Sequence, residues 1–142
     1  MRFDDVLRML DNSGGLAPSL NLTLEQEENG VVGTLPLGPM HAGAPGIAHG
    51  GALMVLLDSV LGARALMHAL PKGRATSTVE MKVNFLRPAP LGRTLVARAD
   101  VQSAGNSLIV VTGTARDAET EEPVAFAVGT FNLYVPKGLA AT

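Results

Sequence analysis

The chain has 142 residues, of which 46% are hydrophobic and 17% charged, a composition that excludes a disordered chain and suits one domain with a buried core. The net charge is -2, the eleven Lys and Arg residues form no basic run, and there is no Trp, so no nucleic-acid partner is expected. Cysteine is absent, which excludes disulfides, thiolate metal sites and a cysteine nucleophile.

The beginning of the chain predicts a short helix and not a targeting signal. Apolar residues recur at helical spacing over residues 3–11, and Asp4 and Asp5 fall in the first turn, where the helix dipole favours acidic groups. A signal peptide would need a basic start and an apolar run instead. The most apolar stretch, residues 52–67, is shorter than the ~20 residues of a membrane helix and is interrupted by two charged residues. We therefore expect a cytoplasmic protein with no membrane partner.

Alternation of apolar and polar residues predicts a hairpin near the beginning of the chain. Residues 20–25 alternate as a strand with one buried face does, and Asn29-Gly30 is a strong turn dipeptide before a second run at residues 31–35. Residues 37–51, rich in Gly, Pro and Ala, are predicted to form a loop.

The remaining elements predict an antiparallel sheet around a helix. A helix-favouring stretch, apolar on nearly every side, predicts a buried helix at about residues 50–69. Four strand-like runs follow at about 75–87, 92–102, 107–116 and 123–134, the first alternating Val79, Met81, Val83 and Phe85 with polar residues. Because their connections are too short for crossover helices, the pairs should be antiparallel. We expect one α+β domain over residues 1–142, with its core at about 18–135 and a five- or six-stranded sheet around the helix.

The segment with candidate functional residues lies at the start of that helix. It reads Gly43-Ala44-Pro45-Gly46-Ile47-Ala48-His49-Gly50-Gly51, and Asp58 follows two helical turns later. Free backbone N–H groups and the positive end of the dipole favour an oxygen that gains negative charge there. No helical neighbour of Asp58 can pair with its carboxylate. Structural hydrogen-bonding roles for Asp58 and His49 remain alternatives, while His41 and His68 are interpreted as incidental and no metal site is predicted.

Two motifs carry a resemblance to a known family. The run His49-Gly50-Gly51-Ala52-Leu53-Met54-Val55-Leu56-Leu57-Asp58 resembles the His-Gly-Gly plus helical Asp motif of PaaI-type hotdog acyl-CoA thioesterases. Residues 78–89 resemble the family's long central strand with its Leu-Arg-Pro ending, and the likeness spans roughly residues 18–135. It implies the hotdog fold, a helix wrapped by an antiparallel sheet. It also implies a homodimer or homotetramer whose active sites lie at the subunit interface, with the Gly-Gly end from one subunit and the acid from the other.

The resemblance implies a catalytic role for each matching residue. The Gly50 N–H would hold the thioester carbonyl oxygen, and Gly51 would support the same turn. Asp58 would attack the carbonyl as nucleophile or activate a water as general base. His49 would shape the loop or contact the thioester, and Thr78 would orient the water or the acid.

The same resemblance suggests the substrate contacts. Gly43 stands where many members have Asn, and the surrounding residues resemble a related subgroup with Gly-x-Pro-Gly-x-x-His-Gly-Gly. Arg87 is the best candidate to bind the phosphates of CoA, and Lys82 is another. No metal or redox cofactor is implied, since coenzyme A enters as part of the substrate.

Three functions remain open from the sequence. Hydrolysis of aromatic or medium-chain acyl-CoA thioesters is favoured by the Gly-Gly motif and the spacing to Asp58. A hydratase or dehydratase acting on enoyl or hydroxyacyl thioesters would instead use His49 and Asp58 to move protons. A non-catalytic acyl-CoA-binding module would keep the fold without turnover, and acyl carrier protein in place of CoA also stays open.

Overall fold

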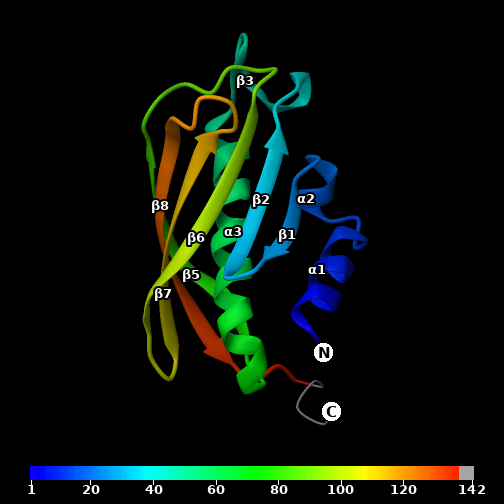
Figure 1. The fold of residues 1–142 in the computed structure, drawn as a ribbon, viewed down its shortest axis with the longest axis vertical. Coiled ribbons are helices and arrows are strands. Elements are labelled where there is room, and N and C mark those ends of the chain that lie inside the picture. Colours follow the sequence, from blue (N-terminus) through cyan, green and yellow to red (C-terminus); the bar gives the residue numbers. More distant parts are fainter. Residues whose placement is uncertain (138–142) are drawn as a thin grey trace.

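The computed structural model describes residues 1–137, which form a curved sheet wrapped around one long helix (Figure 1). The helices are α1 (Phe3–Asp11), α2 (Leu16–Ser19) and α3 (Gly50–Ala69), with short 3-10 turns η1 (Pro39–His41) and η2 (Leu70–Lys72). The strands are β1 (Thr23–Glu27), β2 (Gly30–Pro36), β3 (Ala42–Ala44), β4 (Ile47–Ala48), β5 (Ala75–Phe85), β6 (Thr94–Ala104), β7 (Leu108–Asp117) and β8 (Pro123–Tyr134).

The main sheet has six strands in the order β1-β2-β6-β7-β8-β5, and every neighbouring pair is antiparallel. The expected hairpin is present, with Glu27 opposite Gly30, and its two loop residues are Glu28 and Asn29, since Gly30 is the first residue of β2. The β8–β5 pairing places β5, the strand that follows α3, at the edge of the sheet. The predicted antiparallel α+β hotdog architecture is thus confirmed, with six strands.

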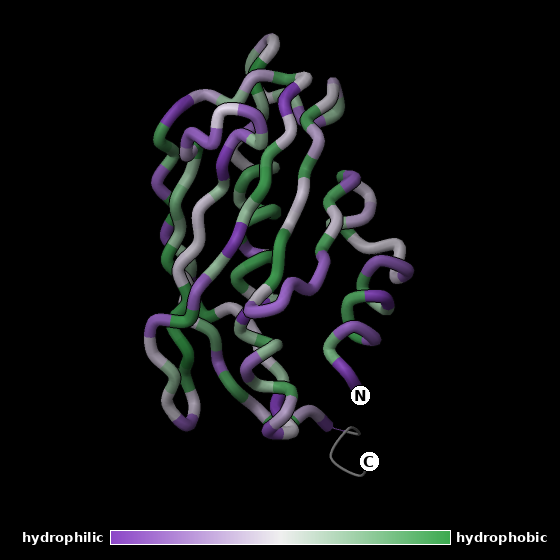
Figure 2. Tube along the Cα trace, viewed as in Figure 1, coloured by the Kyte–Doolittle hydropathy of each residue, from purple (hydrophilic) through white to green (hydrophobic). Residues whose placement is uncertain are grey.

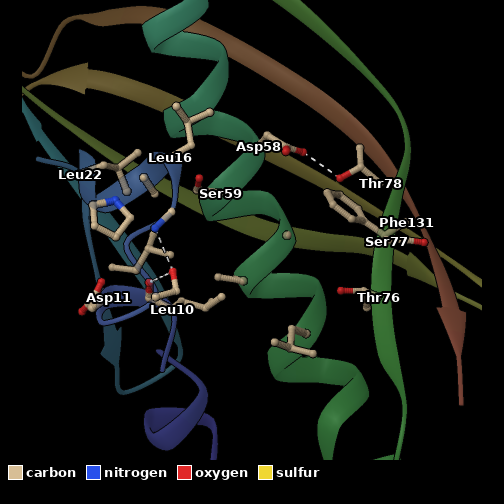
Figure 3. Close-up of a pocket in the computed structure, with 18 residues that line it drawn as sticks. Leu10, Asp11, Leu16, Leu22, Asp58, Ser59, Thr76, Ser77, Thr78 and Phe131 are labelled. Atoms are coloured by element: carbon tan, nitrogen blue, oxygen red, sulfur yellow. Dashed lines mark hydrogen bonds between the residues drawn. The ribbon is translucent and has the colours of Figure 1, made fainter. Parts of the chain in front are cut away.

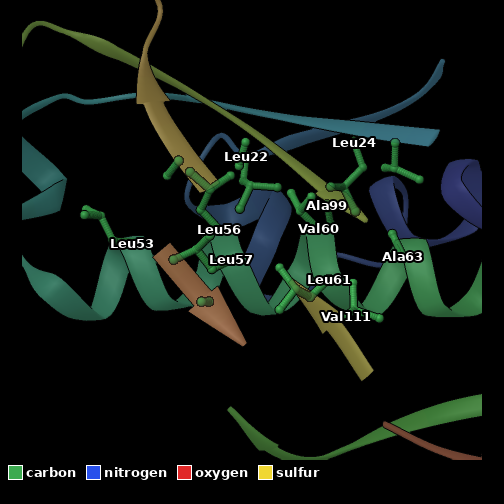
Figure 4. Packing of buried hydrophobic residues seen from close by; sticks show 14 of the residues in the cluster. Leu22, Leu24, Leu53, Leu56, Leu57, Val60, Leu61, Ala63, Ala99 and Val111 are labelled. Atoms are coloured by element: carbon green, nitrogen blue, oxygen red, sulfur yellow. The ribbon is translucent and has the colours of Figure 1, made fainter. Parts of the chain in front are cut away.

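Helix α3 is the centre of the hydrophobic core, and its bounds match the predicted 50–69. It contacts β2, β5, β6, β7 and β8. Figure 4 shows side chains from successive turns of α3, among them Leu56, Leu57 and Val60, packed against residues of the strands, and all three are fully buried. Figure 2 shows the same concentration of apolar residues along α3 and the strands that face it. By length and composition this helix would also pass as a membrane span, yet its buried side chains form the core of the domain.

Two backbone features of the first hairpin and the following loop differ from the sequence expectation. The strand predicted at residues 20–25 begins only at Thr23, because residues 16–19 turn into α2 and Asn21 adopts a left-handed φ of 60°. The predicted loop at residues 37–51 is more regular than expected, since it contains η1 and the small β3–β4 hairpin and ends where α3 begins at Gly50.

Strand β5 does not bury a continuous apolar face. Its register against β8 shifts between Thr78 and Glu80, so Val79 lies in a bulge and is 59% exposed. Phe85, at the end of β5, is 52% exposed. Met81 and Val83, between these two residues, are partly buried against the core, so the apolar alternation seen in the sequence is only partly covered at this edge strand.

Candidate active site

Asp58 lies in the middle of α3 and finds its hydrogen-bond partner on β5. Its Oδ1 atom accepts a hydrogen bond of 2.8 Å from the Thr78 hydroxyl (Figure 3). The carboxylate is half-buried, whereas Thr78 is exposed. The bulge at Val79 directly follows Thr78, and bulges re-aim the neighbouring side chains of a strand. The structure thus brings together two residues that the sequence placed on separate elements.

The first turn of α3 leaves one backbone donor free. His49 is the N-cap residue, and its Nδ1 accepts the Gly51 N–H at 2.7 Å, while the Ala52 N–H donates to the His49 carbonyl. The Gly50 N–H makes no hydrogen bond within residues 1–137. Of the first three amides of the helix, Gly50 therefore offers the donor at the positive end of the dipole.

The bond to Gly51 also fixes the chemistry that His49 can perform. With its Nδ1 lone pair occupied, a neutral His49 carries its proton on Nε2. In this arrangement the exposed ring presents a donor and no basic nitrogen. His49 can stabilise negative charge near the helix terminus, but it is not placed to abstract a proton.

The loop before α3 is held by a residue that the sequence did not single out. His41 is buried, its Nδ1 accepts the Gly38 N–H at 2.9 Å, and its Nε2 is 2.7 Å from the Leu20 carbonyl oxygen. The His41 carbonyl in turn accepts the His49 N–H at 2.7 Å. The interpretation of His41 as incidental is therefore wrong, because this side chain ties the loop to the chain around Leu20. A buried polar side chain cannot be recognised from a lone histidine in a Gly- and Pro-rich segment.

Close packing explains one glycine of the motif and gives a second an unexpected neighbour. A Cβ atom on Gly43 would lie 2.8 Å from the Cα of His49, so an Asn at this position would require the backbone to move. A Cβ atom on Gly50 would meet the Phe85 ring at 3.3 Å. Phe85 therefore packs beside the free Gly50 donor, a contact that the sequence did not reveal.

A cavity of about 420 Å³ begins at Asp58 and continues toward the C-terminal end of α3, away from Gly50. It lies between α3, β5 and the N-terminal segment that includes α1 and α2 (Figure 3). Asp58 and Thr78 both contribute to its wall. The carboxylate is thus accessible to a molecule that occupies this space.

The two candidate phosphate-binding residues lie outside this cavity. Lys82 is exposed on β5. Arg87, just beyond β5, donates to the Pro123 carbonyl and lies 3.8 Å from a Glu122 carboxylate oxygen. These contacts use Nη1 and Nε, so within residues 1–137 the Nη2 atom of Arg87 keeps donors that can face an anion. Residues 1–137 hold no group of three or more His, Asp or Glu side chains arranged to bind a metal ion.

The fold is shared with solved thioesterases. The E. coli PaaI protein from the phenylacetic acid degradation operon superposes with a TM-score of 0.81, at 22% identity and over 93% of this chain and 92% of that one. A thioesterase family protein from Silicibacter pomeroyi gives a TM-score of 0.82 at 26% identity, and the match covers 95% of this chain and 100% of that one. A Bacillus halodurans protein solved with CoA gives 0.75 at 26% identity, covering 92% of this chain and 84% of that one.

Sequence comparison gives the same family. The chain is 28% identical over 94 residues to the acyl-coenzyme A thioesterase THEM4 of Bos taurus, a match that covers 66% of this chain and 37% of that one. It therefore spans little more than a third of the length of this relative. A sequence profile described as Thioesterase superfamily matches residues 45–124, which include the His-Gly-Gly turn, all of α3 and β5. The match extends over more than half of the chain, and this protein belongs to the thioesterase superfamily.

Proposed function

We propose that the protein hydrolyses acyl-CoA thioesters, with aromatic or medium-chain acyl groups, to the free acid and CoA. One observation carries this proposal: the free Gly50 N–H at the start of α3 and the Asp58 carboxylate, held by Thr78, are the two groups that acyl transfer to water requires. The name of the bovine relative and the CoA bound to the Bacillus halodurans protein support CoA as the thiol carrier.

The spacing along α3 favours an active site shared by two subunits. Gly50 and Asp58 are eight residues apart, which corresponds to about 12 Å along a helix with a rise of 1.5 Å per residue. One carbonyl group must lie about 3 Å from both the oxyanion donor and the attacking atom. Gly50 of one subunit and Asp58 of another would satisfy this requirement in a homodimer, or in a homotetramer built from two dimers. The exposed apolar residues at and after the edge strand β5, Val79, Phe85 and Leu86, support such an assembly.

The reaction then follows from the positions of these groups. The Gly50 N–H and the helix dipole stabilise the negative charge that develops on the carbonyl oxygen. Asp58 removes a proton from water, whose oxygen adds to the carbonyl carbon, or adds directly as a nucleophile and is released by water in a second step. Thr78 donates to Oδ1 and leaves the second carboxylate oxygen free to react. The C–S bond breaks, and the CoA thiolate leaves and takes up a proton.

His49 and Arg87 would complete substrate binding. The Nε2–H of His49 is a hydrogen-bond donor on the same turn as Gly50, whereas a hydratase would need a basic nitrogen there. Arg87 and the exposed Lys82 would bind the phosphates of CoA, and Gly43 and Gly51 would shape the turn that the thioester approaches. The proposed reaction uses no metal or redox cofactor.

Free-thiol release from a panel of acyl-CoA esters tests this function, with Asp58→Asn measured beside the wild type. We expect release by the wild type and its loss in the variant, while the thermal unfolding midpoint stays close to that of the wild type. Crotonyl-CoA separates hydrolysis from hydration, since hydration removes the double bond without releasing thiol. Tight binding of acyl-CoA with no turnover of any ester, or full activity of Asp58→Asn, would contradict the proposal.

A further inference from the structure

The cavity beside Asp58 extends both along α3 and across it, from the N-terminal segment to β5. Its wall follows the helix from Asp58 to Leu66, which is eight residues or about 12 Å at 1.5 Å per residue. Figure 3 shows Asp58 and Thr78 at one end and Thr76 further along β5, with the N-terminal segment on the opposite side. A molecule that extends from the carboxylate to Leu66 would lie along the helix.

Gly62 occupies the middle of this wall, where nothing in the backbone requires a glycine. Its φ is not positive, and a Cβ atom would lie 3.5 Å from the Phe131 ring, an ordinary contact. Glycine in a helix interior is less favourable than alanine by about 0.5–1 kcal/mol. The missing side chain therefore carries a stability penalty that neither sterics nor conformation explains. What it provides is open space in the cavity, one helical turn beyond Asp58.

The opposite wall exposes leucines that a bound apolar group would cover. Leu10 of α1 and Leu16 of α2 line the cavity, yet they are 47% and 63% exposed. Leu7 of α1 is buried and Leu22 after α2 is buried, so the segment is anchored to the core on both sides of these residues. The N-terminal segment thus presents aliphatic surface to the cavity from a fixed position.

We propose that this cavity binds the acyl chain of the substrate and that it selects straight aliphatic chains over aromatic acyl groups. The inference rests on the proposed thioesterase function. A cavity of about 150 Å³ is enough to hold a benzene ring, whereas this one is about 420 Å³ and runs along the helix. An aromatic acyl group would leave much of it empty, while a linear chain would pass Gly62 and contact Leu10 and Leu16. Gly62 is then a specificity-determining residue.

Gly62→Ala and Gly62→Leu test the assignment on a panel from butyryl-CoA to dodecanoyl-CoA, with phenylacetyl-CoA included. In the wild type, kcat/KM should rise about fourfold for each added methylene until the cavity is full, because each buried methylene adds about that factor. Gly62→Ala should unfold at a temperature no lower than the wild type, and its loss of activity should increase with chain length, being smallest on butyryl-CoA. It should lose about fourfold on the longest substrates, and Gly62→Leu about 250-fold, since these side chains add one and four carbon atoms to the cavity.

Gly105→Ala is the matched control, because Gly105 lies in the β6–β7 turn outside the cavity and has room for a Cβ atom. This variant should reproduce the wild-type chain-length profile. An unchanged profile in both Gly62 variants, or a wild-type preference for phenylacetyl-CoA over octanoyl-CoA, would overturn the acyl pocket while leaving the thioesterase function intact. Absence of thiol release from every ester would overturn both.

Discussion

Replacing Gly50 with proline removes one backbone donor and leaves the helix able to form. Gly50 is the first residue of α3, the N1 position at which proline is favoured because the N–H there has no intrahelical partner. The preceding residue, His49, has φ -64° and ψ 135°, which is the extended conformation that a following proline requires. We therefore expect Gly50→Pro to fold, with the N-cap bond from Gly51 to His49 retained.

The expected loss of activity follows from the single free amide at this helix start. Removal of one oxyanion donor lowers kcat by about 10²- to 10³-fold, or about 2.7–4 kcal/mol of transition-state stabilisation. Proline also places a Cβ atom 3.3 Å from the Phe85 ring, a contact that requires a small shift of that exposed side chain. Gly50→Ala adds the same Cβ atom but keeps the N–H, so it isolates the steric effect.

Both variants are assayed by single-turnover thiol release from the best acyl-CoA substrate. Their thermal unfolding is recorded in parallel. Gly50→Pro should lose activity by the factor above, and Gly50→Ala should stay within about tenfold of the wild type, because it retains the donor. Equal activities of the two variants would show that the Gly50 amide does not stabilise the carbonyl oxygen. Its assignment as the oxyanion donor would then be wrong.

Three further changes test the surroundings of the site. Thr78→Val should lower kcat/KM by about 10- to 150-fold, which corresponds to the free energy of a hydrogen bond to a charged group. The same substitution should have no effect when Asp58 is already Asn. Thr78→Ser keeps the hydroxyl and should retain most of the wild-type activity. His49→Ala should reduce the free energy of unfolding in urea by about 1 kcal/mol, whereas His49→Asn should restore the cap and show no such loss. Away from the site, Arg93 and two backbone N–H groups hold the pKa of Asp117 well below its ordinary value of 3.8, so its contribution to stability is complete above pH 4 and declines as the pH falls further. Asp117→Asn should therefore lower the Tm at pH 7 and flatten the acid side of the Tm profile; a wild-type slope unchanged by the substitution would refute this.

The sequence by itself determined the elements and the site turn, because these depend on local information. Helix α3 was predicted at its observed bounds since apolar residues cover nearly all of its surface and Pro71 follows it. The hairpin of β1 and β2 follows from two strand-like runs separated by a short polar segment, although its loop residues are Glu28 and Asn29 and not Asn29 and Gly30. The isolated carboxylate of Asp58 and the glycine pair before it are likewise visible in the linear chain.

Only the tertiary structure decided how these pieces work together, because the decisive contacts join residues far apart in the chain. The bond between Thr78 and Asp58 requires β5 to lie beside α3 with a bulge at the right position. His41 acquired its role through burial against the Leu20 carbonyl, which no local pattern encodes. The cavity beyond Asp58 exists because the N-terminal segment, packed beside β1, and the edge strand β5 leave a space over this part of α3, with Gly62 in its wall. Periodicity specifies which side of an element is apolar, but packing alone determines where two such sides meet and where they leave a space between them.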